Sequence, residues 1–416
     1  MIYLDHHATT PVDARVLETM LPFFTERFGN AASKHHRFGW EASDAVERAR
    51  KQVAALMGAG SKEIVFTSGA TEANNLAIKG AAEARRAERN HLVTVTTEHK
   101  AVLDPMTRLA EDGWRVTVLP VNASGLIDLA VLERVVTEHT ALVSVMAANN
   151  EIGVLQPIKQ AAAIAHAKGA WFHTDAVQAA GRVRFDVDAL DVDFASVTAH
   201  KIYGPKGVGA LYVRSAFAKA STSAKASTFA KASTFAKATA DKTADKTADK
   251  SADRVGIVAQ IDGGGHERGL RSGTLNVPGI VGFGRAAEIA GAEMAAEATR
   301  VGELRDRLLD GLRARTEGMT VNGAMDARLP GNLNVSFAGV DGEALLVSLD
   351  DIAVSSGAAC TQAEPSHVLM ALGLSTERAL ASLRFGIGRS TTKDEVDYAA
   401  TRVSEVVSRL RQMSPV

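Results

Sequence analysis

The sequence predicts an α/β fold, with a mainly parallel sheet in a large domain and a smaller α+β domain after it. Between residues 64 and 197, short apolar runs alternate with alanine-rich or amphipathic segments of helical length. Such an alternation builds parallel strands whose connecting helices cover both faces of the sheet. After about residue 276 the alternation stops, and a long helical region precedes short strands and a closing helix.

Six strands and four helices are expected in the large sheet. The strands are 64–66, 92–96, 116–119, 141–147, 170–173 and 194–197, and the helices are 72–89, 100–111, 129–139 and 158–168. Gly113 and Gly169 fall where two helices should stop, and Asp128 falls where one should start. Glycine is favoured just after a helix and aspartate just before one, so these residues support the expected boundaries.

The chain of 416 residues is long enough for two domains. We expect residues 13–275 to form the large domain and residues 1–12 plus 276–416 to form the small one. The small domain should contain strands near 332–337 and 352–354 and a closing helix over 395–413.

A low-complexity segment, residues 217–253, interrupts this pattern. It repeats Phe-Ala-Lys-Ala-Ser-Thr with a period of six and then Asp-Lys-Thr-Ala with a period of four. Between residues 218 and 253 its only large apolar residues are two phenylalanines, so it has too little apolar surface to form a core. We therefore expect a disordered insertion, with some transient helix because of its alanine content.

Composition narrows the class of protein. The chain carries 47 basic and 48 acidic residues, a formal net charge of −1, which argues against a nucleic-acid or membrane surface as the main partner. It has no uninterrupted apolar stretch of about 18 residues and no signal peptide at its start, so a cytoplasmic location is expected. Its single cysteine, Cys360, is unable to form an internal disulfide and is either an inert core residue or a nucleophile.

Polar groups follow five of the six expected strands, at the edge where open α/β sheets carry their ligands. The segments are Ser-Gly-Ala-Thr-Glu (68–72), Thr-Glu-His (97–99), Asn-Asn-Glu-Ile-Gly (149–153), His-Thr-Asp-Ala-Val-Gln (173–178) and Ala-His-Lys (199–201). Lys201, placed at a strand end, is a candidate for holding an aldehyde cofactor; the alternative is an ordinary surface lysine. Cys360 would then attack what the cofactor activates.

The other strand ends supply complementary chemistry. The 68–72 turn opens a helix, whose free N–H groups are suited to a phosphate, although it also fits simple helix capping. Asp175 would need a cationic partner if buried, and a protonated pyridine nitrogen is one such partner. His99 is suited to stacking on a ring or moving protons, or to a structural role. Gln178 and Asn150 would bind a ring hydroxyl or a carboxylate, or cap a loop.

Seven ordered motifs together resemble the cysteine desulfurases of the NifS/IscS type, which are pyridoxal-phosphate enzymes of aminotransferase class V. The motifs are Tyr-Leu-Asp-His-His-Ala-Thr-Thr-Pro (3–11), Phe-Thr-Ser-Gly-Ala-Thr-Glu (66–72), Thr-Glu-His-Lys (97–100), Asn-Asn-Glu-Ile-Gly (149–153), His-Lys-Ile-Tyr-Gly-Pro-Lys-Gly (200–207), Gly-Gly-Gly-His-Glu-Arg-Gly-Leu-Arg-Ser-Gly-Thr (263–274) and Ser-Ser-Gly-Ala-Ala-Cys (355–360). The resemblance covers nearly the whole chain except the repeats. It implies fold type I of the pyridoxal-phosphate-dependent transferases.

The resemblance also implies a role for each candidate residue. Lys201 would bind the cofactor aldehyde, Asp175 the pyridine nitrogen and Gln178 the ring hydroxyl, while His99 would stack on the ring and shuttle protons. The phosphate would be held by Ala70, Thr71, Thr198 and His200, with Thr274 reaching over from a second subunit. Asn150 and Arg384 would grip the substrate carboxylate, for which the planar fork of arginine is suited.

The implied reaction removes sulfur from L-cysteine, leaving L-alanine and a persulfide on Cys360 for iron–sulfur cluster assembly or other sulfur transfer. The implied partners are a second copy of the chain and a sulfur acceptor such as an iron–sulfur scaffold, whose cluster Cys360 would contact only transiently; no resident metal is expected. Alternatives are a selenocysteine lyase, another class V aminotransferase-type enzyme, or a non-catalytic adaptor.

Three departures from the family pattern stand out. Thr198 and Ala199 replace a frequent Ser-Gly before His200, which keeps a hydroxyl for the phosphate. The segment after Cys360 is about two residues shorter than in the group with a long catalytic loop, and a shorter loop reaches less far toward an acceptor. The repeats of 217–253 lengthen a normally short connection, which costs a surface loop little free energy.

Overall fold

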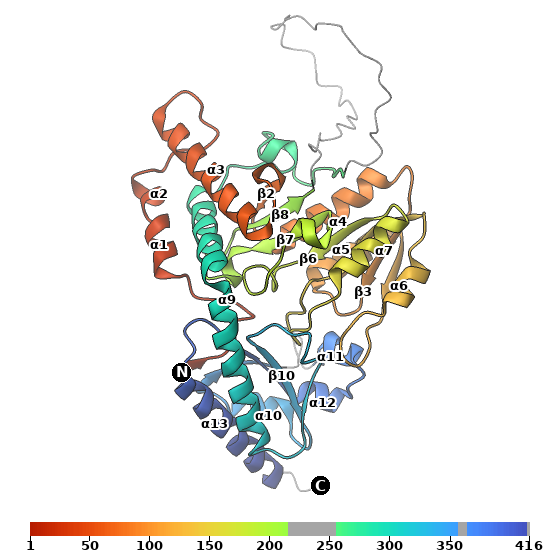
Figure 1. The fold of residues 1–416 in the computed structure, drawn as a ribbon, viewed down its shortest axis with the longest axis vertical. Coiled ribbons are helices and arrows are strands. Elements are labelled where there is room, and N and C mark those ends of the chain that lie inside the picture. Colours follow the sequence, from red (N-terminus) through yellow and green to blue (C-terminus); the bar gives the residue numbers. More distant parts are fainter. Residues whose placement is uncertain (215–254, 357–363, 414–416) are drawn as a thin grey trace, which may run out of the picture.

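The computed structural model describes residues 1–214, 255–356 and 364–413, and its main feature is a seven-stranded sheet (Figure 1). The order across the sheet is β2-β8-β7-β6-β5-β3-β4. The strands are β2 (Ile64–Thr67), β3 (His91–Val95), β4 (Arg115–Leu119), β5 (Thr140–Ser144), β6 (Trp171–Asp175), β7 (Phe194–Thr198) and β8 (Gly209–Val213). All six expected strands are present, and the α/β class with a mainly parallel sheet is confirmed.

Strand β8 is the one member of this sheet that the sequence pattern did not predict. It pairs antiparallel with both β7 and β2, whereas the pairs among β3, β4, β5, β6 and β7 are parallel. Only residues 199–208 separate β7 from β8, and a parallel crossover needs a dozen residues or more. The chain therefore turns back, which places Gly209 between Thr67 and Thr198.

Helices cover both faces of the sheet because successive side chains of a strand point to opposite sides. On one face, α4 (Ala70–Arg85) and α5 (Lys100–Glu111) pack against side chains such as Val65. On the other face, α3 (Arg37–Met57), α7 (Ile158–Ala167) and the first part of α9 (Val277–Arg313) pack against side chains such as Phe66.

The expected signals for helix ends act as predicted. Gly113 and Gly169 adopt φ angles of 91° and 68°, which favour glycine, directly after α5 and α7. The side chain of Asp128 accepts hydrogen bonds from the backbone N–H groups of Ala130 and Val131 at the start of α6 (Leu129–Val135). This helix ends earlier than expected because the backbone of Val136 is extended.

A second hydrophobic core lies beneath the large sheet in Figure 1. It is formed by the last part of α9, by α13 (Lys393–Met413) and by a four-stranded sheet of order β12-β13-β10-β9. These strands are β9 (Met319–Val321), β10 (Asn332–Phe337), β12 (Ser355–Ser356) and β13 (Ser382–Gly386). The N-terminal β1 (Ile2–Tyr3) pairs in parallel with β11 (Ile352–Ala353).

Helix α9 contributes side chains to both cores, including Ile280 to the first and Leu304 to the second. The domain boundary expected at residue 276 therefore stays a prediction, since the helix that begins there joins the two parts.

The remaining elements are short. They are the helices α1 (Ala14–Met20), α2 (Pro22–Thr25), α8 (Val187–Leu190), α10 (Gly342–Val347), α11 (His367–Ala371) and α12 (Thr376–Leu380), and the 3-10 turns Ser61–Glu63, Ala199–Lys201 and Glu267–Gly269. Over the described ranges, no helix combines the length and the apolar character needed to cross a membrane. The expected insertion, 217–253, lies outside the described residues.

Candidate active site

Lys201 ends the 3-10 turn that directly follows β7, at the carboxyl edge of the parallel strands. Its Nζ donates hydrogen bonds to the carbonyl oxygens of His7 at 2.5 Å and Ala8 at 2.8 Å. Burial, followed by the positive charges of Arg182 and Arg384, lowers the pKa of Lys201 to about 7. A substantial share of the amine is therefore neutral near pH 7, the form that reacts with an aldehyde.

A cradle of backbone groups lies beside Lys201 at the start of α4. Gly69, the residue before this 16-residue helix, gives it no side-chain cap, so the first N–H groups of Ala70 and Thr71 are available to an anion. Strand β8 passes very close to Gly69 at Gly209. A Cβ added to Gly209 would lie only 2.7 Å from the Gly69 carbonyl carbon. This close approach places Thr198, which pairs with Gly209, next to the cradle.

His200 is the half-buried residue between Thr198 and Lys201. Burial lowers the pKa of His200 to about 4, with the charges of Lys201 and Lys206 adding to the effect. The ring is therefore neutral near pH 7, and its Nδ1 lies 3.2 Å from the Thr9 hydroxyl. A neutral imidazole next to the cradle is able to donate one hydrogen bond to a phosphate.

Asp175 ends β6 and is only 6% exposed. Its carboxylate accepts hydrogen bonds from Asn74 Nδ2 at 2.8 Å and from the backbone N–H of Val177 at 3.0 Å. Among the residues that the structure describes, no cation forms an ion pair with it. A buried carboxylate without a cation is costly, which makes Asp175 a receptor for a positively charged ligand atom.

His99 and Gln178 have protein partners of their own in the structure. His99 is exposed, and its Nδ1 accepts the backbone N–H of Ala101 at 3.0 Å as the cap of α5. The Gln178 amide contacts His7 twice, with Nε2 donating to the His7 carbonyl and Oε1 lying 3.0 Å from the ring Nδ1. Their expected contacts with a cofactor ring therefore stay predictions.

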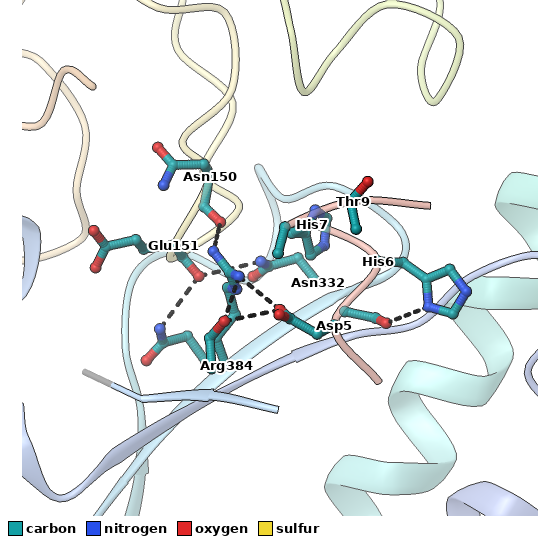
Figure 2. A network of polar contacts seen from close by, with 12 residues as sticks. Asp5, His6, His7, Thr9, Asn150, Glu151, Asn332 and Arg384 are labelled. Carbon is teal, nitrogen blue, oxygen red and sulfur yellow. Dashed lines mark hydrogen bonds and ion pairs between the residues drawn. The ribbon is translucent and has the colours of Figure 1, made fainter. Parts of the chain in front are cut away.

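Arg384 lies on β13, and its guanidinium lies beside Asp5 and Asn150 (Figure 2). Its Nη1 donates to the backbone carbonyl of Asn150 at 2.9 Å, so the two residues expected to hold a carboxylate do meet. Its Nη2 donates to Asp5 Oδ1 at 2.7 Å and to Ser355 Oγ at 2.6 Å.

The remaining two expected site residues are Thr274 and Cys360. Thr274 is exposed and follows Gly273, whose φ of 116° favours glycine, in a loop tied to α4 by an ion pair between Arg271 and Glu72 at 2.8 Å. Its reach toward a second subunit stays a prediction. Cys360 lies outside the described residues.

Sequence reasoning singled out the 3–11 motif but assigned no role to residues within it. His7 is buried, and burial followed by the charges of Arg182 and Arg384 lowers the pKa of its ring well below the usual value. The half-buried Arg182 donates to His7 Nδ1 at 2.7 Å. The only signal in the sequence was the Asp-His-His run itself, since nothing marks which distant residues it meets.

Glu98 is a further buried acid that sequence reasoning passed over. It is 0% exposed, its Oε1 accepts the backbone N–H of Met146 at 2.5 Å, and its Oε2 has no partner. Burial, followed by the negative charge of Asp175, raises the pKa of Glu98 well above its usual value. This shift favours the protonated form of Glu98.

Taken together, the groups at this edge fit pyridoxal phosphate. Lys201 offers an amine for the aldehyde, and the unpaired Asp175 offers a counter-charge for the pyridine nitrogen. The uncapped start of α4, together with Thr198 and His200, offers donors for the phosphate.

Comparisons with known proteins agree with this geometry. The family model described as aminotransferase class-V matches residues 2–399. A protein of Anaeromyxobacter sp. (strain Fw109-5) named cysteine desulfurase IscS is 55% identical, over 100% of this chain and 94% of its own length. A solved NifS-like protein is 38% identical with a TM-score of 0.84, covering 98% of this chain and 100% of its own. A solved structure described as SspA in complex with cysteine is 34% identical with a TM-score of 0.76, covering 94% and 100%.

Proposed function

We infer from the aminotransferase class-V family, to which the chain belongs, that the protein is a pyridoxal-phosphate-dependent cysteine desulfurase. The observation that carries this conclusion is the half-buried Lys201, with its pKa lowered to about 7, at the same sheet edge as the buried Asp175, which has no ion-pair partner among the described residues. The substrate is L-cysteine and the products are L-alanine and sulfur held by the enzyme.

Pyridoxal phosphate, when bound, supplies an electron-poor ring that stabilises negative charge on the substrate carbons. The chain's own residues bind and orient it. Lys201 holds the aldehyde and moves protons at its Nζ, and Asp175 keeps the ring nitrogen charged. Gln178 contacts the ring hydroxyl, and His99 covers the ring.

The phosphate is held at the start of α4 by Ala70 and Thr71, with Thr198, His200 and the partner subunit's Thr274. The open space around Gly69 supports this placement, because an added Cβ there would meet nothing within 4 Å. Arg384 and Asn150 hold the substrate carboxylate and so fix which face of the substrate meets the ring.

Cys360 accepts the sulfur. Its thiolate attacks the sulfur atom of the bound substrate, an S–S bond forms, and the bond between that sulfur and the substrate β-carbon breaks. The β-carbon keeps the electron pair and gains a proton, which gives L-alanine and a persulfide on Cys360. A sulfur acceptor, such as a scaffold for iron–sulfur clusters, then takes the terminal sulfur.

The functional unit is a homodimer. An apolar patch on α1 to α3 supports this proposal, since large exposed apolar patches mark protein interfaces. Its members include Leu21, Phe24, Phe28, Phe38 and Trp40, each between 49% and 66% exposed. Phe28 and Phe38 stack with their ring centroids 5.3 Å apart.

The variant Cys360→Ala tests the reaction. It should bind pyridoxal phosphate and L-cysteine as the wild type does but release neither L-alanine nor sulfide, because no thiolate takes the sulfur. Product analysis by chromatography and a sulfide assay measure this, with absorbance above 400 nm, roughly where the lysine-bound cofactor absorbs, as the check on cofactor content. Lys201→Ala is the matched control and should lose that absorbance. Wild-type rates of alanine release from Cys360→Ala would instead indicate a thiol-independent lyase.

A further inference from the structure

The Arg384 guanidinium is enclosed by three acceptors of the protein (Figure 2). One of them, Asp5, is charged, and the ion pair is largely buried, with 9% of the arginine side chain and 18% of the aspartate side chain exposed. Ser355 joins the pair by accepting from Arg384 and donating to Asp5 Oδ1 at 2.8 Å. The Asp5 carboxylate of the chain itself is thus bound to Arg384, the residue proposed to bind the substrate carboxylate.

The hydrogen-bond capacity of Arg384 decides what this occupancy means. A guanidinium has five N–H donors, and a carboxylate bound in two places uses Nη2 together with either Nη1 or Nε. Both hydrogens of Nη2 are taken, one by Asp5 and one by Ser355, while Nε is buried without a partner. A two-point contact with a second carboxylate therefore requires Asp5 or Ser355 to give up its hydrogen bond.

We propose that Asp5 is a specificity-determining residue, an internal carboxylate that holds Arg384 in place and is displaced from it by the carboxylate of the amino-acid substrate. Asp5, rather than Ser355, gives up its hydrogen bond to Arg384. Asp5 carries a negative charge, and two carboxylates at one guanidinium repel each other. The affinity of the site for a carboxylate is thereby reduced. This inference rests on the proposed function, since it assumes that Arg384 binds the substrate.

The position of Asp5 in the chain connects its displacement from Arg384 to the proposed cofactor site. Residues 5–10 connect β1 to the large sheet and contact the proposed cofactor site at several points: the His7 carbonyl accepts from Lys201, and the Thr10 hydroxyl donates to the His200 carbonyl. Only the Asp5 side chain of this segment meets Arg384, through a single carboxylate oxygen.

The test compares the holoenzymes of wild type, Asp5→Asn and Asp13→Asn. Asp5→Asn keeps the size and one acceptor but removes the charge, so the KM for L-cysteine and the dissociation constant for L-alanine, measured by calorimetry, should each fall by about fivefold, with kcat changing less. L-Cysteinamide lacks the carboxylate, so its KM should not fall. Asp5→Ser, made in parallel, should shift the constants in the same direction.

Asp13→Asn is the matched control, because Asp13 makes a similar ion pair with Arg389 at 2.7 Å, away from Arg384. It should leave all three constants unchanged. A KM for L-cysteine that stays level or rises in Asp5→Asn would overturn the inference and reduce Asp5 to a support for Arg384, as would an equal fall for L-cysteinamide. Wild-type protein that neither converts L-cysteine nor binds L-alanine would refute the proposed function itself.

Discussion

Two buried arginine–carboxylate pairs in this molecule differ in how completely the protein satisfies them. Arg50 and Glu267 meet through two parallel hydrogen bonds of 2.6 and 2.7 Å, with 4% and 1% of their side chains exposed. Arg50 also donates to the Ile64 carbonyl and to Glu47, and Glu267 also accepts the N–H of Phe66. Arg384, by contrast, contacts Asp5 through a single carboxylate oxygen, and the Arg384 Nε has no partner.

The difference supports the proposal that Arg50 holds the fold and Arg384 binds the substrate. A buried ion pair offsets its desolvation only when its remaining donors and acceptors are also satisfied. Arg50 and Glu267 meet this condition within the protein, and they join α3 to the segment that carries Thr274. Arg384 does not meet this condition, because its buried Nε donor has no partner within the protein.

The largest effect is expected at the fully satisfied pair. Glu267→Gln leaves the buried Arg50 without its counter-charge, so the free energy of unfolding should fall by about 3–5 kcal/mol. Urea denaturation followed by circular dichroism measures the loss. Glu47→Gln is the control, since Glu47 pairs with the same arginine but is 55% exposed, and it should cost under about 1 kcal/mol. Equal losses in the two variants would contradict this distinction.

Arg384→Lys should affect binding more than stability. Lysine keeps the positive charge but lacks the planar guanidinium that binds a carboxylate in two places. The KM for L-cysteine should therefore rise by roughly 10–100-fold, while the free energy of unfolding falls by less than about 2 kcal/mol. Steady-state kinetics and urea denaturation on the same preparations separate the two effects. A stability loss as large as that of Glu267→Gln, with KM unchanged, would assign Arg384 to the fold instead.

The smallest effect concerns the pH dependence of cofactor uptake. The folded pKa of Lys201 is about 7, so uptake of pyridoxal phosphate by the apoprotein should slow below pH 7 as the amine becomes protonated. Arg384→Met removes a positive charge that lowers this pKa, so the midpoint should move to higher pH. Stopped-flow absorbance measures both midpoints, and the cofactor's own ionisation is common to them. A midpoint that stays in place or moves to lower pH would show that the Arg384 charge does not reach Lys201.

The sequence predicted the parts of the site that follow buried parallel strands. An apolar run between helices marks such a strand and its carboxyl end, so the placement of Lys201 and Asp175 at strand ends was predicted from local pattern, whereas their roles came from the resemblance. Strand β8 was not predicted because no helix separates it from β7. The chain turns back in the antiparallel direction there, so the alternation of strands and helices is lost.

Contacts between distant parts of the chain were beyond the reach of that reasoning. Asp5 and Arg384 are 379 positions apart, and neither periodicity nor spacing connects them. The polar partners of Lys201 are backbone carbonyls of His7 and Ala8, whose position depends on the path of the chain and not on the identity of the residues. The domain boundaries and the roles of His99, Gln178 and Thr274 stay predictions.

The pairing of the N-terminal segment with β13 also sets when the site is able to form during synthesis. The backbone N–H of His6 bonds to the carbonyl of Gly386, 380 positions further along. At translation rates of about 5–20 residues per second, the segment waits roughly 20–75 s for its partner to leave the ribosome. The seven strands of the large sheet are complete long before that moment. A nascent chain is therefore able to fold this edge of the large sheet before Arg384, the residue proposed to hold the substrate carboxylate, has been synthesised.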